Sequence, residues 1–254
     1  MTTIAIFNQK GGVGKTTTTL NLGAALARRD ISPLLFDLDP QAQLTSMLGI
    51  EPASSNESIF EFYNNVRTLG QLKRTLVNGA EIVPGHAELV KVDYLFGKGP
   101  NILNRLKQGI EEELSATPQR PVLIDCCPLL GVLSLNAIFA ADTVLIPVSS
   151  DYLGFKSAIK LEKNLKSLEQ VVKKRIDRVY LVTRFDMRRK LSLEILRQMF
   201  EKFGVDVCDT RIRESVSLAE SPMHNKDIFA YKKSSRGAQD YANLLDELLT
   251  KNKF

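Results

Sequence analysis

Short apolar runs alternate with longer amphipathic runs along this chain. Most of the short runs are continuously apolar, which is typical of strands that are covered on both faces. Strand–helix alternation of this kind predicts an α/β fold with a doubly wound, mostly parallel sheet flanked by helices. The expected strands are Thr3–Phe7, Pro33–Asp37, Glu81–Val83, Pro121–Cys126, Thr143–Val148 and Arg178–Thr183, and the expected helices are Thr16–Arg29, Gly154–Val172, Ser192–Phe203 and Gly237–Lys251.

The 254 residues contain no internal repeat and no low-complexity linker, so we expect a single domain over residues 1–254. Ala53–Asn56 and Gly97–Pro100 look like loops within it. The first strand begins at the start of the chain, which leaves no room for an N-terminal helix-turn-helix. Neither a signal peptide nor an apolar stretch of membrane-spanning length is visible, and a cytoplasmic protein is expected.

Positive charge is concentrated in the C-terminal third. Residues 173–236 hold 16 Lys or Arg and 9 Asp or Glu, a net charge of +7, whereas the rest of the chain has a net charge of −2. This asymmetry indicates a polyanionic partner. The three cysteines, Cys126, Cys127 and Cys208, include no CxxC pair, so we expect buried thiols rather than a disulfide framework or a zinc site.

The segment KGGVGKTT lies between a predicted strand and a predicted helix. Glycines allow successive N–H groups to face an anion, and the helix N-terminus adds partial positive charge. In such loops the lysine before the helix reaches the β- and γ-phosphates, and the next hydroxyl ligates Mg²⁺. The segment therefore predicts a site for ATP and Mg²⁺, built from Lys10, Gly11, Gly12, Val13, Gly14, Lys15, Thr16 and Thr17.

Carboxylates follow two other predicted strands. Asp37 and Asp39 follow the run LLF, and Asp125 follows the run VLI. Ligands of open α/β sheets bind at the carboxyl edge of the strands. An aspartate at the end of an apolar strand there is typical of the residue that holds Mg²⁺ in P-loop NTPases.

These segments resemble the ParA/MinD family of P-loop NTPases. A strict phosphate loop has glycine where this chain has Gln9, and Lys10 stands before the double glycine as in that family's deviant Walker A motif, KGGxGK[ST]. The run DLDPQ resembles its switch I. The run DCCP resembles its switch II, DxPP, with Cys127 in place of the first proline. The likeness continues through Gly131–Ala137, Leu145–Val148, Thr183–Arg188, Leu218–Pro222 and Gly237–Tyr241, and is weakest over Glu51–Gln119.

The resemblance implies an ATP hydrolase that forms a sandwich homodimer with ATP and is slow until stimulated. Lys10 would reach the phosphates bound by the other subunit, and Asp39 would orient the attacking water or a water on Mg²⁺. Asp37 would be structural. The implied catalytic residues are Lys10, Lys15, Asp39 and Asp125, and the implied metal ligands are Thr16, Asp39 and Asp125.

It also implies that the dimer binds DNA without sequence preference on the nucleoid, and that a ParB-like or cargo-adaptor protein stimulates hydrolysis. Lys and Arg contacts to phosphates supply such affinity. Ser217 stands where the family has a second DNA-contacting arginine. The candidates for DNA contact are Arg188 first, then Arg189 and Lys190, and further Arg211, Arg213, Lys232, Lys233 and Arg236. The cargo, a chromosome, a plasmid or a protein assembly, stays open.

Three alternatives share the phosphate loop. A MinD-like membrane-cycling ATPase needs a basic amphipathic C-terminal helix, but the polar face here carries Asp240, Asp246 and Glu247, so no membrane partner is expected. A redox iron protein needs well-separated cysteines to bridge a cluster. A nucleotide-gated scaffold with little turnover is compatible with the sequence.

Overall fold

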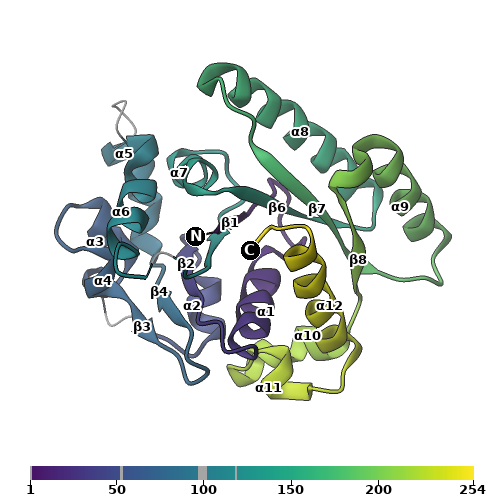
Figure 1. Cartoon of the computed structure of the whole chain (residues 1–254), viewed down its shortest axis with the longest axis horizontal. Coiled ribbons are helices and arrows are strands. Elements are labelled where there is room, and N and C mark those ends of the chain that lie inside the picture. The colour runs from purple at the N-terminus through teal and green to yellow at the C-terminus, as the bar shows by residue number, and fades with distance from the viewer. Residues whose placement is uncertain (1, 52–53, 97–101, 118) are drawn as a thin grey trace.

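The computed structural model of the chain describes residues 2–51, 54–96, 102–117 and 119–254. Its eight strands form one sheet in the order β3-β4-β2-β5-β1-β6-β7-β8, and only β3 runs antiparallel to its neighbour (Figure 1). The strands are β1 Thr3–Ile6, β2 Leu34–Leu38, β3 Arg74–Thr75, β4 Glu81–Val83, β5 Val122–Cys126, β6 Thr143–Ser149, β7 Asp177–Phe185 and β8 Val207–Arg213.

Helices cover both faces of the sheet. One face carries α1 Lys15–Ala27, α2 Gln43–Met47, α10 Val216–Glu220, α11 Ile228–Lys232 and α12 Arg236–Thr250. The opposite face carries α3 Ile59–Tyr63, α4 Leu69–Leu72, α5 Val92–Phe96, α6 Arg105–Glu113, α7 Val132–Ala140, α8 Tyr152–Val172 and α9 Lys190–Phe203. Short 3-10 helices are η1 Ser55–Glu57, η2 Ala87–Lys91, η3 Ile102–Asn104, η4 Gly204–Asp206 and η5 Ser221–His224.

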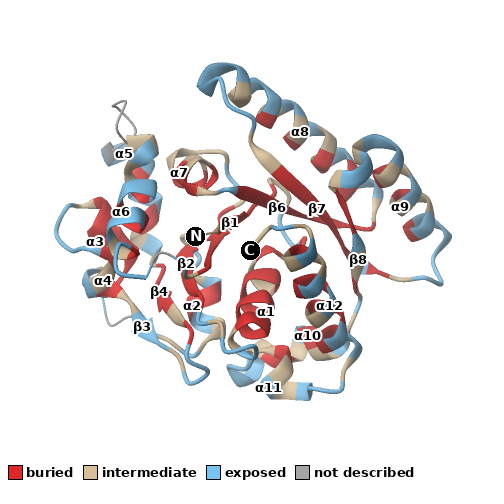
Figure 2. Cartoon of the chain, in the orientation of Figure 1, coloured by how far each residue is buried: buried red, intermediate tan, exposed pale blue. Residues whose placement is uncertain are grey.

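Side-chain alternation explains why the strands are continuously apolar. In β1, Ala5 packs into the core cluster under α7 and α8, while Ile4 and Ile6 pack into the cluster under α1 and α12. Both faces of a central strand are therefore buried, as the red strands in Figure 2 show. This arrangement confirms the predicted α/β fold with a doubly wound, mostly parallel sheet.

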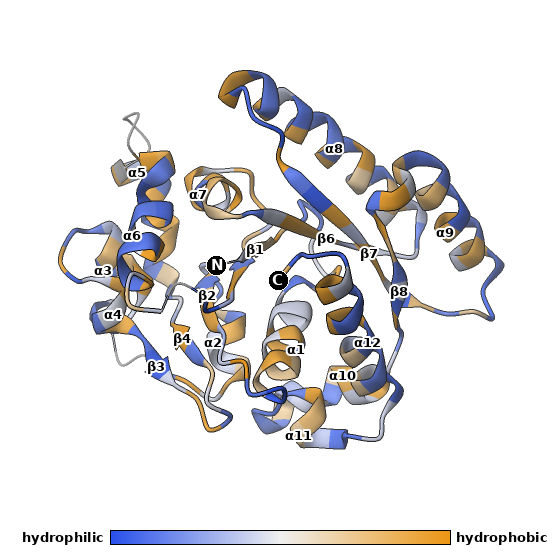
Figure 3. Ribbon diagram, viewed as in Figure 1, coloured by the Kyte–Doolittle hydropathy of each residue, from blue (hydrophilic) through white to orange (hydrophobic). Residues whose placement is uncertain are grey.

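The predicted strands and long helices are present with boundaries shifted by one or two residues, but both edge strands were missed. β8 contains Asp209, Thr210 and Arg211, and β3 has only two residues. Both edges are largely hydrophilic in Figure 3. An edge strand faces solvent along one side, and polar residues there remove the continuous apolar signal. The short helices α3 to α6 also went unpredicted, because few of them span enough turns to show a period.

The expected loop Gly97–Pro100 lies outside the described residues, as does Ala53 of the other expected loop, whose end overlaps η1. The predicted C-terminal helix is α12, and its apolar face is packed against α1. Tyr241, Leu244 and Leu248 are buried there, and the Tyr241 hydroxyl lies 3.2 Å from Thr18 Oγ1. In the described ranges, no helix is long and apolar enough to cross a membrane.

Candidate nucleotide site

The loop between β1 and α1 depends on two glycines in left-handed conformations. Gly12 has a φ of 71° and Gly14 a φ of 90°, which residues with a Cβ rarely adopt. Gly14 is also the N-cap of α1, so the loop leads directly into a helix N-terminus. A Cβ at either position would meet no atom within 4 Å. The backbone conformation, rather than crowding, therefore requires glycine at these positions.

Neighbouring strands hold this loop in place. Asn8 Nδ2 donates to the Pro147 carbonyl of β6 at 2.7 Å, and Asn8 Oδ1 accepts from the Lys10 N–H at 3.0 Å. Thr183 Oγ1 of β7 donates to the Val13 carbonyl at 2.8 Å. The loop is thus preorganised by the sheet, which lowers the ordering cost of binding a ligand.

Lys15 begins α1 and lies against the loop. Its side chain is largely buried, and Nζ donates to the Lys10 carbonyl at 3.3 Å. Thr16 and Thr17 follow in the first turn, where backbone N–H groups are free to meet an anion. The predicted nucleotide-binding residues thus form one continuous segment, a loop that leads into the first turn of α1.

Asp125 lies at the carboxyl end of β5, beside Ile6 of β1 and Asp37 of β2. Its Oδ1 accepts from Thr19 Oγ1 at 3.4 Å, but buried Oδ2 has no hydrogen-bond partner among the described residues. Burial, followed by the charge of Asp37, raises the pKa of Asp125 well above its ordinary value. An unpaired buried carboxylate oxygen next to Lys15 fits a hard cation such as Mg²⁺, which would restore the charged form.

Asp37 and Asp39 have different surroundings. Buried Asp37 accepts from the Thr45 hydroxyl at 2.7 Å, from the Thr45 N–H at 2.9 Å and from the Asp39 N–H at 3.1 Å. Burial raises the pKa of Asp37 to about 6. The Asp39 carboxylate accepts a hydrogen bond within the turn, from the Gln41 N–H to Oδ1 at 2.9 Å. Asp37 therefore fixes the β2–α2 turn, and this turn holds Asp39.

The cysteines are free and buried, as expected. Burial raises the pKa of Cys127 to about 11, so it stays a thiol at neutral pH and a poor nucleophile. Cys126 packs in the core cluster under α7 and Cys208 in the cluster on the opposite face of the sheet. No group of three His, Cys, Asp or Glu able to hold a metal occurs in the described ranges.

Lys10 makes contacts within its own chain. Its Nζ donates to Asp151 Oδ1 at 2.8 Å and to Ser149 Oγ at 2.9 Å, and its side chain is 28% exposed. Asp151 is also the N-cap of α8 and accepts from Gly154 N–H at 2.8 Å. The ammonium group is therefore held at the rim of the loop in this conformation.

A cavity of about 240 Å³ adjoins the phosphate loop. Sequence reasoning missed it because its walls come from four separate segments. Loop residues and Thr17 line one side, and the β7 end, the β8–α10 connection and α12 supply the rest. Its lining residues are Gly12, Val13, Gly14, Thr17, Thr183, Arg184, Ile212, Arg213, Glu214, Ser215, Leu218, Ala219 and Tyr241. Position and size suit the base of a nucleotide whose phosphates lie in the loop.

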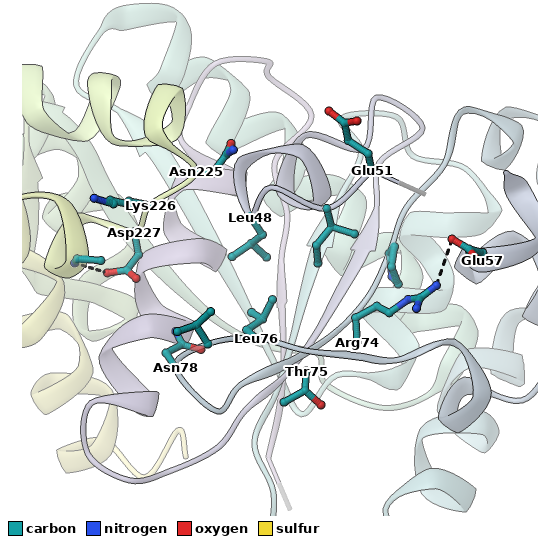
Figure 4. Close-up of a pocket in the computed structure, with 14 residues that line it drawn as sticks. Leu48, Glu51, Glu57, Arg74, Thr75, Leu76, Asn78, Asn225, Lys226 and Asp227 are labelled. Atoms are coloured by element: carbon teal, nitrogen blue, oxygen red, sulfur yellow. Dashed lines mark hydrogen bonds and ion pairs between the residues drawn. The ribbon is translucent and has the colours of Figure 1, made fainter. Parts of the chain in front are cut away.

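A larger cavity, of about 760 Å³, lies elsewhere, between the end of α2, the β3–β4 hairpin and the start of α11. Figure 4 shows Leu48 and Leu76 in its middle, Lys226 and Asp227 at one end, and the Arg74–Glu57 ion pair at the other. No phosphate-loop residue lines it. Volume alone would therefore misplace the nucleotide site.

The candidate DNA contacts fall into groups. Arg188 has an 88% exposed side chain that pairs with Asp186 at 2.9 Å, and Arg189, 61% exposed, contacts the same carboxylate at 3.4 Å. Lys190 is also exposed, at the start of α9. The second group lies where α11 ends and α12 begins, and consists of the exposed residues Lys232, Lys233 and Arg236.

Arg213 is paired with a carboxylate of α12. Its guanidinium contacts buried Asp240 of α12 through Nε at 3.0 Å and also through Nη2, and it lines the smaller cavity. Breaking such a pair leaves a buried charge uncompensated. Arg213 therefore links β8 to α12. Arg211 is half-buried over the Phe185 ring.

The preorganised loop, the inward lysine and the unpaired aspartate oxygen together define a P-loop nucleotide-binding protein. Sequence comparison agrees, since residues 1–178 match the family described as "AAA domain". The chain is 35% identical to the sporulation initiation inhibitor protein Soj of Bacillus subtilis, over 96% of this chain and 97% of that protein. It is 31% identical to the chromosome partitioning protein ParA of Caulobacter vibrioides, over 98% of this chain and 94% of that protein.

Among solved structures, the fold is similar to cobyrinic acid a,c-diamide synthase from Mycobacterium smegmatis with bound ADP and magnesium. The TM-score is 0.84 and the identity 27%, covering 100% of this chain and 96% of that one. With relatives above 30% identity along nearly its whole length, the chain belongs to the ParA/Soj family of P-loop ATPases.

Proposed function

We propose that this protein is an ATP-driven positioning ATPase. In this proposal its ATP-bound homodimer binds DNA without sequence preference, and a ParB-like or adaptor protein stimulates slow hydrolysis. The observation that carries the proposal is the pair of lysines on one preorganised loop. Lys15 faces the phosphate-binding side, whereas Lys10 lies at the rim of the loop and is paired with Asp151. The partition proteins among the relatives support the same reading.

In the proposed site the loop N–H groups and Lys15 hold the triphosphate, and the adjoining cavity takes the base. Thr16 and the unpaired Oδ2 of Asp125 would hold Mg²⁺. The ion, when bound, neutralises charge on the β- and γ-phosphates. Asp39, positioned by the turn that Asp37 fixes, orients the attacking water.

The rim of the loop suits a second copy of the chain. Leu129, Tyr152 and Leu153 expose 72%, 56% and 65% of their surface next to switch II and Asp151. Exposed apolar groups around a catalytic loop favour an interface between subunits. Lys10, released from Asp151, would then add positive charge to the partner's phosphates.

DNA retention across a salt series tests the proposal. We expect the protein to bind nonspecific duplex DNA with ATP, weakly with ADP or no nucleotide, and to lose affinity steeply as salt rises. A protein that dimerises with ATP but never binds DNA would contradict the DNA assignment and direct the search to liposomes and protein partners.

Single-turnover phosphate release with and without DNA separates an active ATPase from a nucleotide-gated scaffold. In this proposal the protein associates with the nucleoid in the cytoplasm.

A further inference from the structure

β7 ends in a bulge beside the phosphate loop. Its pairing with β8 shifts register between Val182 and Phe185. Both of these residues pack into the core cluster under α8 and α9, whereas Thr183 bonds to the phosphate loop on the opposite face. In a regular strand Arg184 would share the face of Val182. Because of the bulge, Phe185 instead lies on the face of Val182, and Arg184 turns toward the phosphate loop and the cavity beside it.

Arg184, the residue that the bulge turns toward the cavity, has an unfavourable backbone conformation. Its φ is 51°, in the left-handed region that a residue with a Cβ rarely adopts. Ser150 Oγ donates to the Arg184 carbonyl at 2.8 Å, and the Glu214 N–H donates to the Phe185 carbonyl at 3.1 Å. Backbone outliers that are fixed in this way cluster at ligand sites.

The Arg184 side chain lines the 240 Å³ cavity next to the loop. It is 61% exposed, and its ion-pair contact from Nη2 to Glu214 Oε1 is long at 3.5 Å. Leu218 and Tyr241 also line this cavity. A partly exposed planar cation therefore lines a cavity whose other walls are partly apolar, and in such surroundings arginine can stack on an aromatic ring.

We propose that Arg184 covers one face of the purine ring of the bound nucleotide and so contributes to base binding. The inference rests on the proposed function, because that function puts the phosphates in the loop and the base in this cavity. A cation–π stack of this kind strengthens nucleotide binding by about 3-fold to 20-fold.

The test compares ATP with inorganic tripolyphosphate, which has no base, by calorimetry on the full chain. We expect Arg184→Met to raise the dissociation constant of ATP by about 3-fold to 20-fold and to leave that of tripolyphosphate unchanged. Equal losses for both ligands, or no loss for either, would overturn the inference. If the wild-type protein binds tripolyphosphate as tightly as ATP, the base contributes no affinity, and a role for Arg184 in base binding is again excluded. A wild-type protein that binds neither ligand would overturn the proposed function itself.

Two further variants guard against a folding defect and a general charge effect. Arg184→Gly suits the left-handed backbone, so its melting temperature should not fall, yet its ATP affinity should drop like that of Arg184→Met. Arg197 on α9 has the same 61% exposure and also pairs with glutamates, so Arg197→Met should leave ATP affinity unchanged. A loss of DNA retention with unchanged ATP affinity in Arg184→Met would assign Arg184 to the DNA surface and reject the base contact.

Discussion

At the residue scale, the ion pair between Lys10 and Asp151 competes with the proposed dimer. Asp151→Asn removes the negative charge but keeps an oxygen that can cap α8 through Gly154. We expect ATP-dependent dimers to form at about 2-fold to 5-fold lower protein concentration, since partly exposed pairs contribute about 0.5–1 kcal/mol. Light scattering with ATP measures this shift. Weaker dimers in Asp151→Asn would mean that Asp151 supports the interface instead.

The titration of Asp151 sets the pH range of this effect. Burial acts to raise the pKa, but hydrogen bonds from Lys10, Ser149 and Gly154 outweigh it and lower the pKa of Asp151 to about 2. The pair is therefore fully charged above the ordinary aspartate pKa and is lost only as the pH falls toward 2. The difference between wild type and Asp151→Asn should consequently stay constant from pH 5 to pH 8.

Lys10→Ala, which removes the other partner of this ion pair, should have the opposite effect on dimerisation. The loop N–H groups and Lys15 remain, so ATP binding should persist, while ATP-driven dimerisation and turnover should be lost. Equilibrium binding of a fluorescent ATP analogue and light scattering on the same sample separate the two. An ATP dimer of normal stability in Lys10→Ala would remove Lys10 from the interface.

At the element scale, α7 is capped from another helix. The Val132 N–H donates to Asp93 Oδ1 of α5 at 2.8 Å, and a Cβ on Gly131 would collide with the same carboxylate. Asp93→Ala should cost about 0.5–1 kcal/mol of stability, a typical loss for an N-cap, whereas Asp93→Asn keeps an acceptor oxygen and most of the stability. Thermal melting of the nucleotide-free protein measures both. Equal losses in the two variants would show that charge, not capping, matters here.

At the scale of the whole molecule, the basic C-terminal third makes a prediction about DNA. Arg188 is 88% exposed on the β7–α9 turn and pairs with Asp186 of the same turn. Arg188→Glu should weaken DNA retention for every sequence and reduce the salt slope by at least about 1, with ATP affinity unchanged. Arg197→Glu, the same change of charge at a 61% exposed position on α9, should have a smaller effect. Undiminished retention in Arg188→Glu would exclude it as a phosphate contact.

The sequence was most informative where chemistry depends on neighbours in the chain. The glycines of the phosphate loop, Lys15 and the strand-ending Asp125 are close in sequence to the elements that position them, so their places were predictable. Arg213 was not, because its pairing with Asp240 joins residues 27 positions apart. Arg184 was overlooked because a bulge, rather than a motif, re-aims its side chain.

The sequence by itself determined the α/β class, the central strands and the phosphate loop, because periodic burial and glycine conformations act over a few residues. Only the tertiary structure decided the two edge strands, the cavity beside the loop and the contacts of Lys10 and Arg213. Each of these brings together segments from distant parts of the chain. Their free energies depend on which strands become neighbours, and that choice is made by packing of the whole sheet rather than by any local pattern.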